Sequence, residues 1–313
     1  MKNITMVAEF TLLGFSIYPK LRIHIFFLVS LFYIMTMVVD LIIILLVLLN
    51  SKMQKPMYCF LANLAVIDIC FVNTTIPNLL KDIWKESKSI SVTCCLAQMY
   101  SHILSGTAEF LLLAVMSFDR YVAICFPLHY NTIMKRQLCI HLIAGVWYGS
   151  FLFTCTPVYL IMKLTFCFPI IDHFFCDIYP LLKKSCTSTL LVKNCVVVSS
   201  SLIIVSLIIT VISYINIIIT VVKIKTTEGK QRVFTTCSSH ALVVSFAYGS
   251  CIFTYFHPSR IPQLYFNKNV SILNAVIVPL VNPFIYTVRN QCIKEAIHDI
   301  YLKLISQGIS VYL

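Results

Sequence analysis

The chain has 313 residues, of which 59% are apolar and only 12% are charged. Ordinary soluble domains carry roughly 25% charged residues, so this composition excludes a soluble globular protein and indicates a membrane protein. The net charge is +12. Lysine and arginine are spread along the chain without a basic stripe, so we expect no nucleic-acid partner.

Seven apolar runs are each long enough to cross a bilayer as a helix, which takes about 20 residues. None of them contains more than one charged side chain. In chain order they cover residues 25–49, 58–80, 96–118, 138–162, 194–222, 233–258 and 269–288. The connections are too short for a separate soluble domain. This pattern predicts an all-α membrane protein, a seven-transmembrane helix bundle.

The predicted bundle spans residues 25–290. Residues 1–24 precede it as an extracellular segment, and residues 291–313 follow it as a cytoplasmic tail with a short amphipathic helix. The positive-inside rule does not decide the orientation, because twelve lysines and arginines fall on each face. The direction therefore depends on other signals.

Sequons and cysteines favour an extracellular N-terminus. Sequons begin at Asn3 and Asn269, and we expect glycosylation at Asn3. Five cysteines fall on the same side of the predicted membrane, which suggests disulfides in an oxidising compartment. They are Cys94, Cys95, Cys167, Cys176 and Cys186. We therefore predict a multi-pass protein of the plasma membrane.

Several sequence strings resemble one known family, and they occur in that family's order and spacing. They are KPMYCFLANLAVID (55–68), CCLAQMY (94–100), MSFDRYVAIC (116–125), PLHY (127–130), HFFCD (173–177), SY (213–214), TTCSSH (235–240) and PLVNPFIYTVRN (279–290). Together they resemble the vertebrate olfactory receptors, a branch of the rhodopsin-like G-protein-coupled receptors. The resemblance covers nearly the whole chain.

The resemblance implies an odorant receptor that activates a heterotrimeric stimulatory G-protein and raises cyclic AMP, in contact with membrane lipid and without enzyme activity. The implied switch residues are Asp119, Arg120, Tyr121, Tyr214 and Tyr286. In such receptors the arginine pairs with its neighbouring acid at rest and turns toward the G-protein on activation. The two later tyrosines approach it in the active state.

The resemblance also implies two disulfides, Cys95–Cys176 and Cys167–Cys186, with Cys95–Cys186 as an alternative. The implied odorant pocket lies in the outer half of the bundle. Its residues are His102, Ile103, Gly106, Thr107, Val198, Leu202, Cys251, Ile252, Tyr255, Ile272 and Ala275. This mainly apolar lining suits a small neutral molecule with few polar groups. An amine ligand is disfavoured, because amine receptors carry an acid where this chain has His102.

Three acids lie at one depth inside the predicted spans. Asp40 lies ten residues before Asn50, Asp68 ten after Tyr58 and Glu109 ten before Asp119, so each is about 15 Å along a helix from the expected cytoplasmic end. The spans offer them no lysine or arginine, and an isolated buried carboxyl favours its neutral form. Two interpretations stay open: a sodium ion held by Asp68 and Glu109, or neutral acids hydrogen-bonded with Asn282.

Asp40 departs from the family, which has asparagine there, and we expect the acid to cost stability or trafficking. We also expect it to be protonated, because a third negative charge at that depth would have no evident compensation. Other departures, such as Phe118 before Asp119, interrupt no span.

Other functional classes have less support. A polytopic transporter is disfavoured because the sequence shows no internal repeat and no glycine-broken pair of half-helices. The scattered histidines share no metal-ligand spacing that would indicate an enzyme. A receptor of the same fold for a non-volatile ligand outside the nose remains the main alternative.

Overall fold

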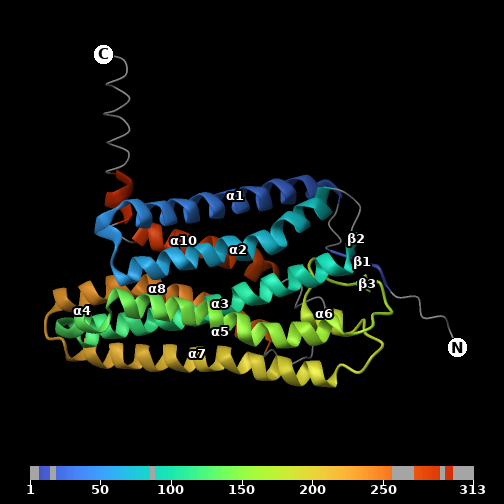
Figure 1. The fold of residues 1–313 in the computed structure, drawn as a ribbon. Helices are drawn as coiled ribbons and strands as arrows, with labels where there is room; N and C mark the ends of the chain where they lie inside the picture. The colour runs from blue at the N-terminus through green and yellow to red at the C-terminus, as the bar shows by residue number, and fades with distance from the viewer. Residues whose placement is uncertain (1–6, 15–18, 85–88, 256–270, 290–292, 299–313) are drawn as a thin grey trace, which may run out of the picture.

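The computed structural model describes residues 7–14, 19–84, 89–255, 271–289 and 293–298. Long helices run side by side as a bundle, with a small sheet across one end (Figure 1). The long helices are α1 (Pro19–Leu49), α2 (Pro56–Trp84), α3 (Val92–Cys125), α5 (Arg136–Met162), α7 (Leu190–Lys223), α8 (Thr227–Tyr255) and α10 (Val278–Arg289). They correspond to the seven predicted spans, and the π-helical turn η3 (Leu273–Ile277) leads into α10.

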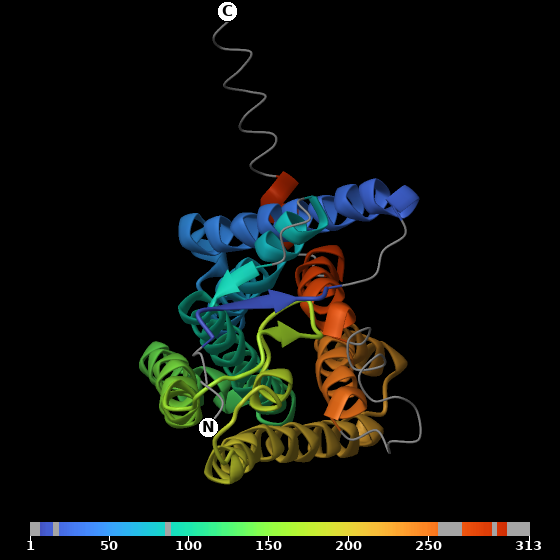
Figure 2. The same ribbon diagram turned by 90° about the vertical axis from the view of Figure 1, so that its right-hand side faces the viewer.

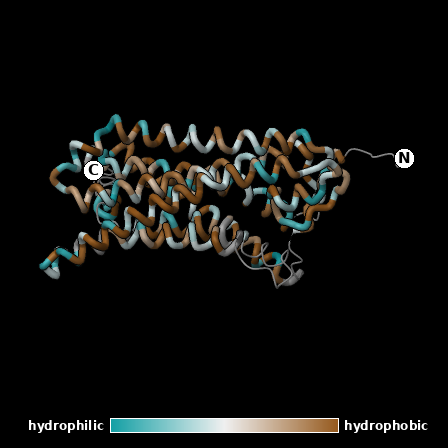
Figure 3. Tube along the Cα trace, turned by 90° about the horizontal axis from the view of Figure 1, so that it is seen from below, coloured by the Kyte–Doolittle hydropathy of each residue, from teal (hydrophilic) through white to brown (hydrophobic). Residues whose placement is uncertain are grey.

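The lengths of the helices suit a bilayer. By length and composition, α1, α2, α5 and α7 can each cross a membrane. Helix α3 qualifies together with η2 (Pro127–His129) and α4 (Tyr130–Ile133), which bend from it by 112°. Helices α8 and α10 contain the shorter apolar segments Cys237–Ile252 and Ala275–Thr287. Figure 3 shows mainly apolar or neutral residues along the bundle and more hydrophilic ones toward its ends.

Helix α7 shows how the bundle packs in lipid. Its exposed face is apolar, whereas Ser206, Thr210 and Ser213 are buried inside. Small polar residues let transmembrane helices approach closely. Their hydroxyls remain satisfied, because Thr210 Oγ1 donates to Ser206 O over 2.9 Å and Ser213 Oγ donates to Ile209 O over 2.8 Å. The helix is therefore polar toward the protein and apolar toward the lipid.

Pro157 lies inside α5 and lacks the backbone N–H that would reach the Phe153 carbonyl. Ser199 of α7 compensates, since its hydroxyl donates to Phe153 O over 2.7 Å. In a bilayer a freed backbone carbonyl needs such a partner. The proline thus ties α5 to α7 without ending the helix.

A three-stranded sheet covers the end of the bundle at which α3 begins, which is the end predicted to be extracellular and is called the outer end below (Figure 2). Strand β1 (Glu9–Leu12) lies in the middle, antiparallel to β2 (Ser89–Ser91) and parallel to β3 (Ile170–Ile171). Phe10 and Leu12 point inward and are at most 2% exposed. The segment before α1, the α2–α3 connection and the long α5–α7 loop therefore share one side.

Two disulfides join this end of the bundle, and both match the predicted pairing. The Cα atoms of Cys95 and Cys176 are 5.4 Å apart, and those of Cys167 and Cys186 are 5.8 Å apart. Both distances fall within the usual range of about 4.4–6.8 Å. The first bridge fixes the long loop to the start of α3.

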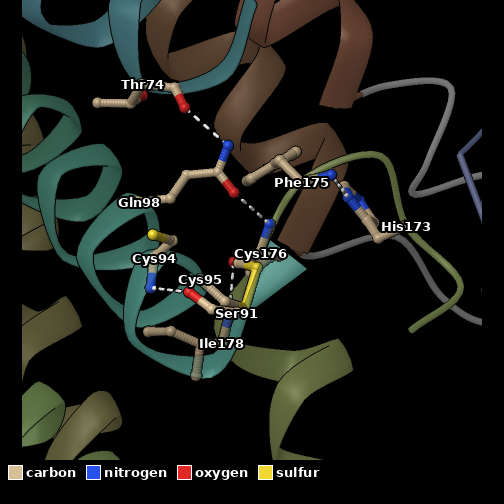
Figure 4. The surroundings of a disulfide bond; sticks show 10 residues. Thr74, Ser91, Cys94, Cys95, Gln98, His173, Phe175, Cys176 and Ile178 are labelled. Atoms are coloured by element: carbon tan, nitrogen blue, oxygen red, sulfur yellow. Dashed lines mark hydrogen bonds between the residues drawn. A yellow bond between two sulfur atoms is a disulfide. The ribbon is translucent and has the colours of Figure 1, made fainter. Parts of the chain in front are cut away.

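Gln98 strengthens the same attachment (Figure 4). Its Oε1 accepts from Cys176 N–H over 3.1 Å, and its Nε2 donates to Thr74 O over 2.7 Å. The side chain is 6% exposed. One buried amide therefore holds the loop, α3 and α2 together.

Some predicted features lie outside the described residues. These are Asn3, the sequon at Asn269 and most of the tail expected to form an amphipathic helix. Residues 293–298 are helical, and Ile293 and Ala296 are buried in the core cluster that also holds Tyr286. Helix α1 begins at Pro19, before the predicted start at residue 25.

Cys95→Ser is expected to destabilise the protein by about 2–5 kcal/mol, the usual cost of removing a native disulfide from a small domain. Surface display of the tagged protein, measured by flow cytometry, should fall sharply. Cys94 is the matched control, because it is exposed and unbridged. If Cys94→Ser and Cys95→Ser behaved alike, the bridge would not be what supports the fold.

Candidate functional site

Asp119 and Arg120 lie near the end of α3 that is opposite the disulfides. Arg120 Nη2 contacts Asp119 Oδ2 at 2.7 Å, and the two residues are 7% and 1% exposed. Tyr130 of α4 donates from its hydroxyl to the other carboxylate oxygen, Oδ1, over 2.8 Å. Both oxygens of Asp119 are thus engaged, and a buried, hydrogen-bonded pair is worth more than an exposed one.

Aromatic side chains from three other helices lie within electrostatic range of this arginine. Tyr214, His240 and Tyr286 all lie within electrostatic reach of Arg120. The Tyr214 hydroxyl and His240 Nδ1 are 2.7 Å apart, and the two rings are stacked. The Tyr286 hydroxyl is buried and has no hydrogen-bond partner among the described residues. Side chains of α7, α8 and α10 therefore lie within electrostatic range of the Arg120 guanidinium on α3.

Tyr121, the third residue of the motif, makes different contacts from Asp119 and Arg120. Its ring contacts the rings of Phe118 and Phe126, with centroids 6.2 and 5.6 Å away. It is half-buried, and these contacts involve its own helix and the residue that ends it.

A second polar layer lies deeper in the bundle. Asn282 Nδ2 donates to Asp68 Oδ1 and Oδ2 over 3.3 and 3.4 Å and to Glu109 Oε1 over 3.1 Å. All three side chains are at most 5% exposed. One amide from α10 therefore bridges carboxyls of α2 and α3, as the hydrogen-bonded interpretation requires.

The donor chemistry of this layer also fits a small hard cation such as sodium. Asn282 Oδ1 is buried without a hydrogen-bond partner among the described residues. It could act as an oxygen ligand beside the two carboxyls, and oxygen ligands suit hard cations. Within the described ranges, however, no group of three or more acid, histidine or cysteine side chains is arranged to hold a metal.

Asp40 lies next to this layer but is not bonded to it. The side chain is 0% exposed, and neither carboxyl oxygen has a hydrogen-bond partner in the part of the chain that the structure describes. It is within electrostatic reach of Asp68. An unpaired buried acid costs free energy in lipid.

In the outer half of the bundle, His102 lies between two aromatic rings. Its centroid is 4.4 Å from that of Phe71 on α2 and 4.7 Å from that of Phe175 in the long loop. Its Nδ1 is buried and has no partner in the described ranges. Thr107 is 8% exposed, and a Cβ added to Gly106 would sit 3.6 Å from Phe71.

The other predicted pocket residues differ in how they pack. Ile103 packs against the cluster that contains Val196, whereas Ala275 and Ile272 pack against the cluster that contains Phe175. Leu202 and Cys251 are half-buried. The side chain of Tyr255 lies outside the described residues. The assignment of these positions to a ligand stays a prediction.

Val198 and Ile252 were assigned wrongly. They are 63% and 46% exposed, so they face the lipid. At about 100° per residue, Val198 lies roughly a quarter turn or more away from the buried stripe of α7, which runs through Val196 and Ser206. Ile252 is displaced similarly from the stripe of α8, whereas its neighbour Cys251 lies on that stripe.

Sequence reasoning missed several residues that the structure makes prominent. Tyr130, His240 and Gln98 appeared only as letters within motifs. Tyr248 lies within the sixth apolar run, and its hydroxyl donates to Ser206 Oγ over 2.9 Å and to Phe110 O over 3.3 Å. Each of these residues is polar and lies either within a largely apolar run or beside the Asp119–Arg120 motif. That position in the sequence could have indicated a buried polar contact.

Comparison with known proteins decides the family. The olfactory receptor family model matches residues 29–304. The chain belongs to the olfactory receptor family. It is 42% identical to human olfactory receptor 2AP1 over 98% of this chain and 100% of that protein, and 42% identical to human olfactory receptor 6C3 over 97% and 98%. Members of this family are signalling receptors, not enzymes.

The fold of this olfactory receptor is that of rhodopsin. The crystal structure of squid rhodopsin matches with a TM-score of 0.71 over 95% of this chain and 92% of that one, at 16% sequence identity. The similarity supports the seven-helix architecture alone.

Asp40→Asn is expected to raise surface expression. The amide keeps the shape of the side chain and removes an ionisable group, relieving a penalty of about 1–3 kcal/mol. Flow cytometry of a tagged receptor measures the change. The contrast is Asp68→Asn, which should give no gain because the Asp68 carboxyl accepts from Asn282. Equal or lower expression of Asp40→Asn would contradict the proposed penalty.

Proposed function

We propose that this chain is an odorant receptor of the plasma membrane. It binds a small, neutral, mostly apolar molecule in the outer half of the bundle, activates a stimulatory G-protein and raises cyclic AMP. The observation that carries the proposal is the buried Asp119–Arg120 pair clamped by Tyr130, with Tyr214 and Tyr286 within electrostatic reach of the guanidinium. Family membership gives this cluster its signalling role.

The described geometry corresponds to a resting switch. Arg120 is held by Asp119, and Tyr214 is held by His240, so neither is free to meet a cytoplasmic partner. Activation must break contacts between α3, α7 and α8. A ligand can do so only if it binds the rearranged bundle better than the resting one. A G-protein that binds freed Arg120 stabilises the same rearranged state.

The chemistry of the outer half supports a neutral ligand. The predicted positions that face inward are apolar or carry neutral groups such as Thr107. His102, which lies between two tilted aromatic rings, offers one buried nitrogen. A cationic ligand would need a carboxylate, and the nearest intramembrane acid on α3 is Glu109, two turns deeper and bonded to Asn282. One or two ligand oxygens match the available polar groups.

The sheet and the disulfides support an extracellular N-terminus. Strand β1 pairs with β3, which lies in the same loop as Cys167, Cys176 and Cys186. Disulfides persist in oxidising compartments. An extracellular N-terminal segment would place the Asn3 sequon on the side where glycosylation occurs.

A cyclic AMP reporter screen in cells that display the receptor tests the proposal. Volatile neutral odorants form one arm, and non-volatile metabolites form the other. Activation by volatile neutral compounds supports the odorant role. Activation only in the second arm would favour the alternative, a receptor of the same fold outside the nose.

Arg120→Ala is expected to abolish agonist-stimulated cyclic AMP while surface expression stays near that of the parent. Arg120 belongs to the switch rather than the central packing. Arg136→Ala is the control, because Arg136 is exposed at the start of α5 on the same end of the bundle. Full signalling by Arg120→Ala at normal expression would overturn the switch assignment.

His102→Ala, Thr107→Val and Tyr255→Phe are expected to raise the effective agonist concentration without changing expression. Leaving a ligand group unsatisfied costs about 1–3 kcal/mol, or roughly 5- to 150-fold in affinity. Dose–response curves for an agonist from the screen measure the shift. Val198→Ala should leave the curve unchanged because Val198 faces the lipid. The pocket assignment fails if all three variants match the parent or if the best agonist is a permanent cation.

A further inference from the structure

A groove opens between the outer halves of α3 and α5, apart from the ligand and switch residues. It encloses about 720 Å³. From α3 its walls include Leu96, Ala97 and Tyr100, and from α5 they include Cys155, Tyr159 and Met162. These residues follow helical spacing, so each wall is one face of a helix over two turns. The groove is therefore about 10 Å long.

The groove faces the lipid rather than the interior of the bundle. Tyr159 and Met162 are 58% and 61% exposed, and Ala97 is also exposed. At the deep end Tyr100 Oη lies 3.9 Å from Cys155 Sγ, and this contact joins the two walls. The small side chain of Ala97 leaves the space open, while the Ser199–Phe153 bond holds α5 against α7.

Hydrocarbon is the solvent at this surface, and an empty apolar groove would lose dispersion contacts with its lining. Water is a poor occupant, because a water molecule needs two to four polar partners. An acyl chain fits the apolar walls and the length of the groove. Lipid tails are as apolar as the walls themselves, so preference for one lipid must come from shape and from the headgroup.

Lys163 supplies a headgroup contact at the outer rim. It directly follows the last residue of α5, and its Nζ lies 5.3 Å from the centroid of the Tyr159 ring. The side chain is exposed, and the lining residues of the groove include no acid. An ammonium can bond a lipid phosphate directly, and it does so best where no cationic group of the headgroup competes for that phosphate.

We propose that the α3–α5 groove binds an anionic phospholipid, with one acyl chain between the helices and its phosphate at Lys163. The site is independent of the odorant pocket. Charge complementarity at the rim selects this lipid over a sterol, whose hydroxyl would gain little from an ammonium.

Photocrosslinking of the full-length receptor in nanodiscs tests the proposal. The probes are phosphatidylglycerol and phosphatidylcholine with a photoreactive acyl chain. Mass spectrometry then compares labelling of residues 93–100 and 155–162 with that of residues 204–212, on the lipid-facing side of α7. We expect several-fold more label in the groove, and a preference for phosphatidylglycerol of roughly fivefold, the effect of one basic group at a membrane surface.

Matched variants separate the two parts of the site. Ala97→Phe, or the smaller Ala97→Leu, fills the groove and should remove the excess label. Val205→Phe is the control and should not remove it, because Val205 is exposed on the lipid-facing side of α7. Lys163→Gln should abolish the headgroup preference, Lys163→Arg should keep it, and Lys193→Gln should leave it unchanged. Thermal unfolding checks that each variant folds.

Three outcomes would overturn the proposal. The groove could label no more strongly than α7, the two phospholipids could label it equally, or excess cholesterol could displace both probes regardless of Lys163. The last outcome would assign the groove to a sterol.

Discussion

Hydrocarbon offers buried polar groups no partner, so the bundle has to satisfy them itself, and most of its architecture follows from that constraint. The hydroxyls of α7 bond their own backbone while packing inward. The carbonyl freed by Pro157 is taken up by Ser199 of a neighbouring helix. The side-chain amide of Asn282 donates to the carboxyls of both Asp68 and Glu109. Each solution fixes how one helix is rotated against another.

The two ends of the bundle use charge and cross-links differently. At the end of α3 that lies away from the disulfides, Arg120 is buried with Asp119 and Tyr130, and these contacts are non-covalent. At the opposite end, the Cys95–Cys176 bridge and Gln98 fix the long loop over His102. One end is therefore held by an ion pair and hydrogen bonds, and the other also by covalent bonds. Asp40 differs from the polar groups at both ends, because neither oxygen of its buried carboxyl has a hydrogen-bond partner among the described residues.

The sequence alone determined the architecture and the main chemical groups. Apolar runs of membrane length marked the seven helices, because a helix that crosses a bilayer needs about 20 consecutive, mainly apolar residues. Helices of soluble proteins do not need such runs. The motifs then identified the family, and with it the disulfide pairs and the Asp119–Arg120 ion pair. The shared depth of Asp68 and Glu109 was also readable, since position along a helix converts directly into distance.

Only the tertiary structure decided how the helices are rotated and which distant residues meet. A helix that is apolar on all sides carries little periodicity, so the sequence could not show that Val198 and Ile252 face the lipid. Gln98 meets Cys176 across 78 residues of sequence, and Tyr214 meets His240 across 26. Such contacts depend on how whole helices pack, and packing in lipid is set by neighbours rather than by local sequence.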